Sequence, residues 1–155
     1  MRVFQLKKDS EYHVEQDTFN MEIEGINKIN CITIDNPVQN NCLYVINHLV
    51  CKFGKNKNTA HLIISNNDKQ FKDTTTLGGL NIGYKYDKEE DLDNLEIDIV
   101  NIDTNREIDI LEKYSLIILP GGNIQIKLEE PQEKMSLLIR DRKSTRLNSS
   151  HHPDL

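Results

Sequence analysis

The stretch Tyr114-Ser115-Leu116-Ile117-Ile118-Leu119-Pro120-Gly121-Gly122 decides our interpretation of the fold. Its first six residues are almost continuously apolar, a pattern typical of a strand buried on both faces, as the strands of parallel sheets are. A proline and two glycines follow, and these residues favour a turn. We therefore expect a central strand over residues 114–119 and a tight turn at residues 120–122.

Two more strands are predicted before this one, with helices between them. Residues 80–86 and 97–102 are rich in apolar and β-branched side chains, which favours strands. The segments 88–95 and 104–113 each begin near an Asp or Thr that is followed three residues later by Glu, a spacing typical of helix N-termini. Pro131 fits the first turn of a last helix.

The first half of the chain has a different pattern. Residues 12–35 contain alternating apolar and polar side chains, which predicts short strands, and the apolar run at 60–64 predicts a buried strand. Residues 42–53 fit an amphipathic helix, although so short a run also fits a strand. The polar stretch 68–76 is interpreted as a linker.

These patterns predict the fold class α/β. Alternating strands and helices form a parallel sheet with helices on its faces. We expect a partial flavodoxin-like parallel sheet in residues 78–140, preceded by a β-rich region of unclear type in residues 1–75.

The decisive stretch also resembles a known family. The strand at 114–119 with Pro120-Gly121-Gly122, preceded by the strand 97–102 and a helix ending at Lys113, resembles the third-strand region of class I glutamine amidotransferase-like proteins, which include PfpI-type hydrolases. The resemblance covers residues 78–140. It implies that a backbone amide of Gly121 or Gly122 contributes to an oxyanion hole, and that the substrate of the full-length protein is a small amide.

The resemblance also implies that the chain is an inactive fragment. The nucleophile of the family is a cysteine on a strand-to-helix elbow, which would lie at about residue 150 or beyond, and its partner histidine lies further downstream. The full-length protein would then hydrolyse an amide, whereas the present chain would not.

The last residues carry a different signature. The peptide from Asp141 to His151 is identical to one translated reading frame of a common short-read sequencing adapter, and its composition departs from that of the residues before it. We therefore predict that residues 141–155 are a non-native tail and that the authentic sequence ends near Arg140. The pair His151 and His152 is accordingly not interpreted as a metal site.

No cofactor or metal is predicted. Cys31, Cys42 and Cys51 lack the Cys-x-x-Cys spacing of zinc and redox sites, and we interpret them as small buried hydrophobic residues. A dyad of His48 with one of the last two cysteines is the alternative. His61 lies at the start of the predicted buried strand 60–64, and we assign it no ligand role.

Composition limits the remaining function classes. The 155 residues carry a net charge of −6, which argues against a nucleic-acid-binding protein, because phosphate neutralisation needs clustered lysine and arginine. No apolar run reaches the ~18 residues of a membrane span, and the N-terminus lacks a signal-peptide core, so we expect a soluble, cytoplasmic protein. Two alternatives to the amidotransferase interpretation remain: a non-catalytic interaction domain with a sandwich-like N-terminal module, and an α/β-hydrolase fragment. The sequence does not indicate an oligomeric state.

Overall fold

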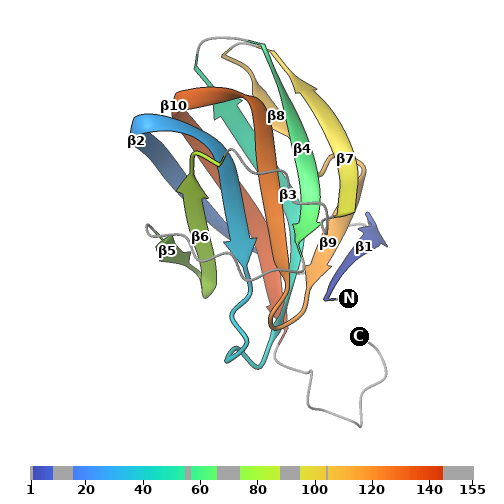
Figure 1. Cartoon of the computed structure of the whole chain (residues 1–155). Helices are drawn as coiled ribbons and strands as arrows, with labels where there is room; N and C mark the ends of the chain where they lie inside the picture. Colours follow the sequence, from blue (N-terminus) through green and yellow to red (C-terminus); the bar gives the residue numbers. More distant parts are fainter. Residues whose placement is uncertain are drawn as a thin grey trace, which may run out of the picture.

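The chain folds into strands only. The computed structural model describes residues 2–8, 16–54, 57–65, 74–87, 95–103 and 105–144, excluding the side chains of 25–27 and 65. Within these residues there are ten strands and no helix (Figure 1). The strands are β1 (Val3–Lys7), β2 (Asp17–Asp35), β3 (Leu43–Phe53), β4 (Asn58–Ser65), β5 (Thr74–Leu77), β6 (Leu80–Lys85), β7 (Leu95–Ile102), β8 (Glu107–Asp109), β9 (Tyr114–Ile118) and β10 (Asn123–Ser144).

All pairings between these strands are antiparallel. The main path through the sheet is β1-β9-β3-β10-β2-β6-β5, while β4 pairs with β10 and β7, and β8 pairs with β3. The prediction of an α/β fold with a flavodoxin-like parallel sheet is therefore wrong. Most of the predicted strands exist, but the segments between them do not form the helices that a parallel sheet needs as crossovers.

Two long strands pass through both layers of the molecule. The first part of β10, residues 123–128, pairs with β4 and with the second part of β2. After register shifts between Lys127 and Lys134, the second part of β10 pairs with β3 and with the first part of β2. Figure 1 shows that β2 and β10 bend over at the same end of the molecule. We call the two halves the β4 layer, which also holds β5, β6 and β7, and the β3 layer, which also holds β1, β8 and β9.

The core lies between the layers and follows a period of two. Leu49, Cys51 and Phe53 of β3 are fully buried, and Met135 and Ile139 of β10 lie in the same cluster. Side chains at alternate positions of a strand point to the same face, so the residues between them form the outer face.

A β-bulge explains the predicted helix at residues 42–53. The register between β3 and β10 shifts where Arg140 faces His48 and Asp141 faces Ile46, which leaves Asn47 as the extra residue. Ile46 and Leu49 are consequently both buried although they are three residues apart. That spacing imitates a helix, and the alternative interpretation of this segment as a strand is confirmed.

The predicted helix that begins at Pro131 is also wrong. Residues 123–144 form the single strand β10, in which Met135, Leu137 and Ile139 alternate into the core. The segment 104–113 holds the short strand β8 and a turn, with residue 104 outside the described residues. The predicted helix at 88–95 falls almost wholly outside them, and its last residue, Leu95, begins β7.

The expected boundary near residues 75–78 lies within a β-hairpin. Leu77 and Leu80 face each other across the two-residue turn Gly78-Gly79, and both glycines have positive φ angles, 59° and 95°. These angles are typical of the type I′ turns that join adjacent strands. Because β2 pairs with β10 and β1 with β9, the two predicted regions contribute strands to one sheet.

The predicted non-native tail overlaps the end of β10. Residues 141–144 continue the strand and face residues 43–46 of β3. Residues 145–155, with His151, His152 and the position expected for a catalytic elbow, lie outside the described residues. The adapter origin of the tail stays a prediction.

Candidate functional site

The two glycines expected in an oxyanion hole form a turn between β9 and β10, two strands that each pair with β3 and are not paired with each other. The amide of Gly122 donates to the carbonyl of Leu119 at 2.8 Å, and Gly121 has a φ of +84° at the position where a type II turn favours glycine. The Gly121 amide donates to the carbonyl of Asn36 at 2.7 Å. Both amides thus donate to backbone carbonyls within the protein, and these hydrogen bonds hold the turn.

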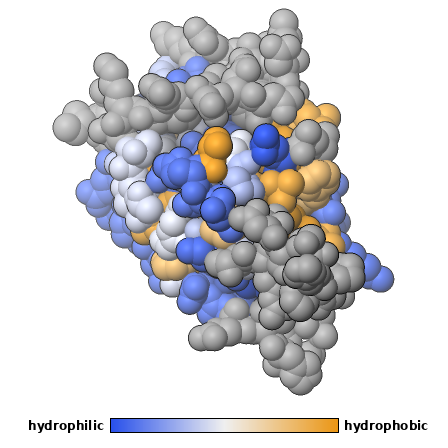
Figure 2. Space-filling model, turned by 90° about the horizontal axis from the view of Figure 1, so that it is seen from below, coloured by the Kyte–Doolittle hydropathy of each residue, from blue (hydrophilic) through white to orange (hydrophobic). Residues whose placement is uncertain are grey.

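Among the described residues, both polar and apolar side chains lie around this turn. Arg2 donates to the carbonyl of Pro120 at 2.9 Å, and Val38 of the β2–β3 loop lies against Gly121 with 71% of its surface exposed. Figure 2 views the molecule from this end, and its coloured residues are a mixture of hydrophilic and hydrophobic types.

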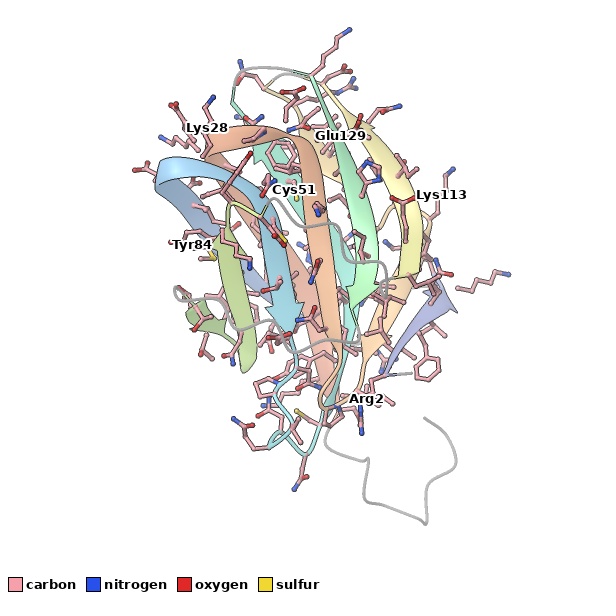
Figure 3. The ribbon with its side chains drawn as sticks, viewed as in Figure 1. Arg2, Lys28, Cys51, Tyr84, Lys113 and Glu129 are labelled. Atoms are coloured by element: carbon pink, nitrogen blue, oxygen red, sulfur yellow. The ribbon has the colours of Figure 1, made fainter. Side chains whose placement is uncertain are left out.

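The three cysteines are buried and form no disulfide, and their burial agrees with the interpretation as small hydrophobic residues. Figure 3 shows Cys51 in the interior, and burial, followed by the nearby charge of Asp109, raises the pKa of its thiol to about 12. His48 lies on the other face of β3, where its Nδ1 is 2.7 Å from Oδ2 of Asp109. The alternating positions on β3 separate His48 from Cys51, so these two residues do not form a dyad.

His61 takes part in a polar cluster on the outside of the β4 layer. Its Nδ1 contacts the carboxylate of Glu96 on β7, and its Nε2 is 3.3 Å from Oε2 of Glu129 on β10. The two ring nitrogens point to different carboxylates, so the three side chains do not converge on one point. Within the described residues no group of three or more His, Cys, Asp or Glu side chains could hold a metal ion.

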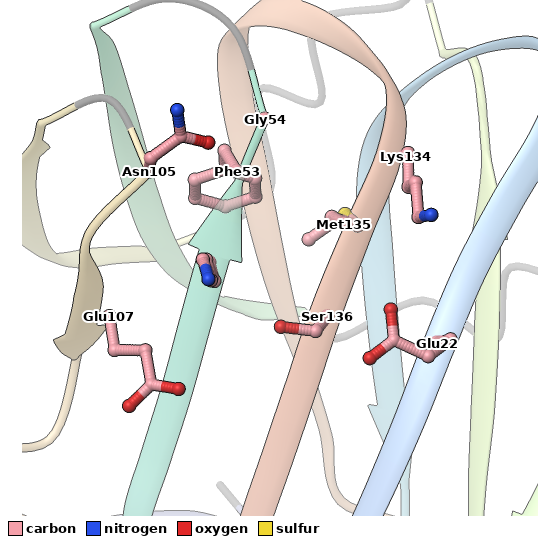
Figure 4. A pocket seen from close by; sticks show the side chains of 9 residues that line it. Glu22, Phe53, Gly54, Asn105, Glu107, Lys134, Met135 and Ser136 are labelled. Carbon is pink, nitrogen blue, oxygen red and sulfur yellow. The ribbon is translucent and has the colours of Figure 1, made fainter.

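The clearest candidate for a ligand site is a cavity on the outer face of the β3 layer, which we call the outer-face pocket. Its volume is about 350 Å³, and Figure 4 shows it from close by. The residues that line it come from β2, β3, β8 and β10 and from the ends of β3 and β8: Glu22, Lys52, Phe53, Gly54, Asn105, Glu107, Lys134, Met135 and Ser136.

Strand register places four of these residues in one row. Ser136 of β10 faces Glu22 of β2 on one side and Lys52 of β3 on the other. Lys52 in turn faces Glu107 of β8. Figure 4 shows Glu107 and Glu22 at opposite sides of the pocket, with Ser136 between them. We call these four residues the cross-strand row.

The charges in the cross-strand row are not neutralised by one another. Within the described residues, no ion pair involves Glu22, Lys52 or Glu107, although all three are exposed around the cavity. Lys134 at the rim does have a partner, because its Nζ is 3.3 Å from Glu24. The row therefore offers two carboxylates and one ammonium group to a ligand.

An apolar step lies beside the row. Val50 and Leu138 face each other one position further along β3 and β10, on the same outer face. They line a second, smaller cavity of about 140 Å³ that shares Glu22, Glu107 and Ser136 with the outer-face pocket. The combined surface can therefore contact charged groups and an aliphatic chain at the same time.

No motif in the sequence indicates these residues. Lys52 and Ser136 each lie between two buried neighbours, so their outward direction was predictable for a strand. What brings Glu22 and Glu107 to one cavity is pairing between segments far apart in the chain, which a local pattern does not contain.

No protein-family model, curated protein or solved structure matches the chain. Among the described residues, no helix is long and apolar enough to cross a membrane.

Proposed function

We propose that this chain is a non-catalytic binding domain whose ligand surface is the outer-face pocket. The observation that supports it is the cross-strand row, in which Glu22, Lys52 and Glu107 surround one cavity without pairing with each other. Charged groups that have no ion-pair partner among the described residues can pair with a ligand of complementary charge, and such pairs orient the ligand and add to its affinity.

Binding is better supported than catalysis by the chemistry of the candidate residues. A nucleophile needs an adjacent base and a site that stabilises the developing charge. Cys51 has a raised pKa and is buried, His48 is directed to Asp109, and the amides of Gly121 and Gly122 already have acceptors. We therefore favour the interaction-domain interpretation over an amide hydrolase or an α/β-hydrolase.

The location proposed is the cytoplasm. None of the three cysteines forms a disulfide, which fits a compartment that keeps thiols reduced. The net charge of −6 disfavours nucleic acid as a partner. A membrane surface is disfavoured for the same reason, since basic residues are what anionic lipids attract.

The test combines activity assays with a binding map. We expect no hydrolysis of glutamine or of p-nitrophenyl acetate above the uncatalysed rate. We expect amide chemical shifts at residues 20–22, 50–54 and 134–138 to move when the ¹⁵N-labelled protein is titrated with a panel of amino acids, diamines, dicarboxylates and monosaccharides. Turnover that survives purification, or a panel in which no compound moves these amides, would contradict the proposal.

A further inference from the structure

We infer that the ligand of the outer-face pocket is a free basic amino acid, that is, a zwitterion with a second cationic group on an aliphatic side chain. This inference rests on the proposed function and specifies its ligand. It follows from the number, order and spacing of the charges in the cross-strand row, together with the apolar step beside it.

The charge count matches such a ligand. Glu22 and Glu107 can each pair with a cationic group, and Lys52 can pair with one anionic group. A basic amino acid has an α-ammonium group, a side-chain cation and an α-carboxylate. A diamine leaves Lys52 unpaired, whereas an acidic amino acid brings a second carboxylate toward two glutamates, which is unfavourable.

The order of the charges along the cross-strand row also matches the order of the charges in a basic amino acid. The two carboxylates stand at the ends of the row, and Lys52 and Ser136 stand between them on adjacent strands. Three strand spacings of about 4.8 Å separate Glu22 from Glu107, or about 14 Å between their Cα atoms. The glutamate side chains extend into this interval, which leaves a gap that an amino acid in extended conformation can bridge.

The apolar step accommodates the rest of the ligand. Val50 and Leu138 are half-buried and lie next to the row on the outer face. The methylene groups of a lysine-like side chain can cover these two residues while its terminal ammonium group reaches a carboxylate, as long cationic side chains commonly do on protein surfaces. The α-carboxylate then lies over Lys52 and can accept a hydrogen bond from the hydroxyl of Ser136.

The experiment is a calorimetric and NMR titration of the full chain with four probes: L-lysine, cadaverine, L-norleucine and L-glutamate. Cadaverine lacks the carboxylate of lysine, and norleucine lacks its side-chain cation. We expect lysine to bind at least about tenfold more tightly than any of the other three, because each lacks or reverses one charge-assisted contact. The moving amides should lie at residues 20–22, 50–54 and 134–138.

Two variants separate the roles of the charges. Lys52→Met should weaken lysine binding about tenfold and leave cadaverine binding unchanged or stronger, whereas Glu22→Gln should weaken both. The matched controls are Lys113→Met and Glu112→Gln, which replace exposed residues in the turn before β9 and should change nothing. Far-UV circular dichroism and the melting temperature verify that each variant is folded.

The outcomes distinguish this inference from the function on which it rests. If glutamate, norleucine or cadaverine moves the pocket amides and lysine does not, the ligand class is wrong and the binding domain stands. If lysine binds but Lys52→Met and Lys113→Met behave alike, the assignment of the carboxylate to Lys52 is wrong. If no probe moves these amides, both proposals fail.

Discussion

Replacing Asp141 by asparagine should stabilise the protein at neutral pH. Asp141 lies on β10 two positions after Ile139, so the period of two places it on the core side, and it is 1% exposed. Its neighbours across the sheet are Ile46 and Asp17, and its Oδ2 is buried without a hydrogen-bond partner. A buried carboxylate in such surroundings is destabilising when it is charged.

The magnitude follows from the pKa. Burial, reinforced by the charge of Asp17 and opposed by Lys143, raises the pKa of Asp141 from 3.8 to about 6. One pKa unit corresponds to about 1.4 kcal/mol, so the charged form costs at most about 3 kcal/mol of folding free energy at pH 7. Asparagine has nearly the same shape and no charge, and it should recover about 1 to 3 kcal/mol because its amide is still left buried.

The raised pKa also fixes the direction in which the free energy of unfolding changes with pH. Because the folded pKa is above the unfolded one, the folded state binds more protons between about pH 4 and pH 6, and stability falls as the pH rises through this window. The advantage of Asp141→Asn should therefore be present at pH 7 and nearly absent at pH 4. Urea unfolding followed by circular dichroism at both values measures it.

The control is Asp103→Asn, which neutralises an exposed carboxylate near the end of β7. It should change the free energy of unfolding by less than about 0.5 kcal/mol at either pH. A destabilised Asp141→Asn variant at pH 7, or an equal gain at pH 4 and pH 7, would show that the argument from burial and charge is incorrect.

Three other predictions concern the loops and the tail. Asn36→Ala should lower the free energy of unfolding by about 2 to 4 kcal/mol, because the buried Asn36 side-chain amide donates to two backbone carbonyls at 2.9 and 3.0 Å. The control is Asn41→Ala, which changes an exposed residue of the same loop. Equal melting temperatures of the two variants would contradict the stabilising role of these hydrogen bonds. Gly121→Ala should cost about 1 to 2 kcal/mol in urea unfolding because of the positive φ, and a neutral effect would mean that the turn is relaxed in solution. Sequencing of source DNA across codons 138–155 should give an apolar residue in place of Asp141; the printed sequence read through to Leu155 would refute the adapter origin.

Local patterns predicted four of the ten described strands well. The apolar runs at 60–64, 80–86, 97–102 and 114–119 coincide with β4, β6, β7 and β9 to within a few residues. Strand formation depends on β-branched residues and alternation, and both are visible in a short window. The cysteine interpretation was correct for a similar reason, because it needed only the apolar context of each residue.

The connections between the strands and the pairing of the strands could not be predicted from local sequence patterns. A capping-box-like spacing precedes β8 as it would precede a helix, so the local signal at Glu107 was ambiguous. The decisive contacts are non-local: β2 pairs with β10, which begins about one hundred residues later. An apolar strand such as β9 looks the same whether it is covered by helices or by a second layer of strands, and the α/β interpretation depended on that choice.

The candidate site was missed for the same reason. Gly121 and Gly122 carried a recognisable motif, but their surroundings differ from those that the motif suggested. Glu22 and Glu107 carried no motif at all, and their relation exists only through the register of four strands.

The bend of β2 and β10 has a consequence for how the molecule opens. Since each of these strands belongs to both layers and the two layers share one core, unfolding of either layer exposes the core face of the other. Hydrogen exchange of the amides at residues 124–127 and 135–139 should then require the same global opening, with one common free energy. A ligand bound over β3 would therefore also slow hydrogen exchange of the amides in β4. Exchange rates on one face of the molecule would then depend on ligand binding at the opposite face.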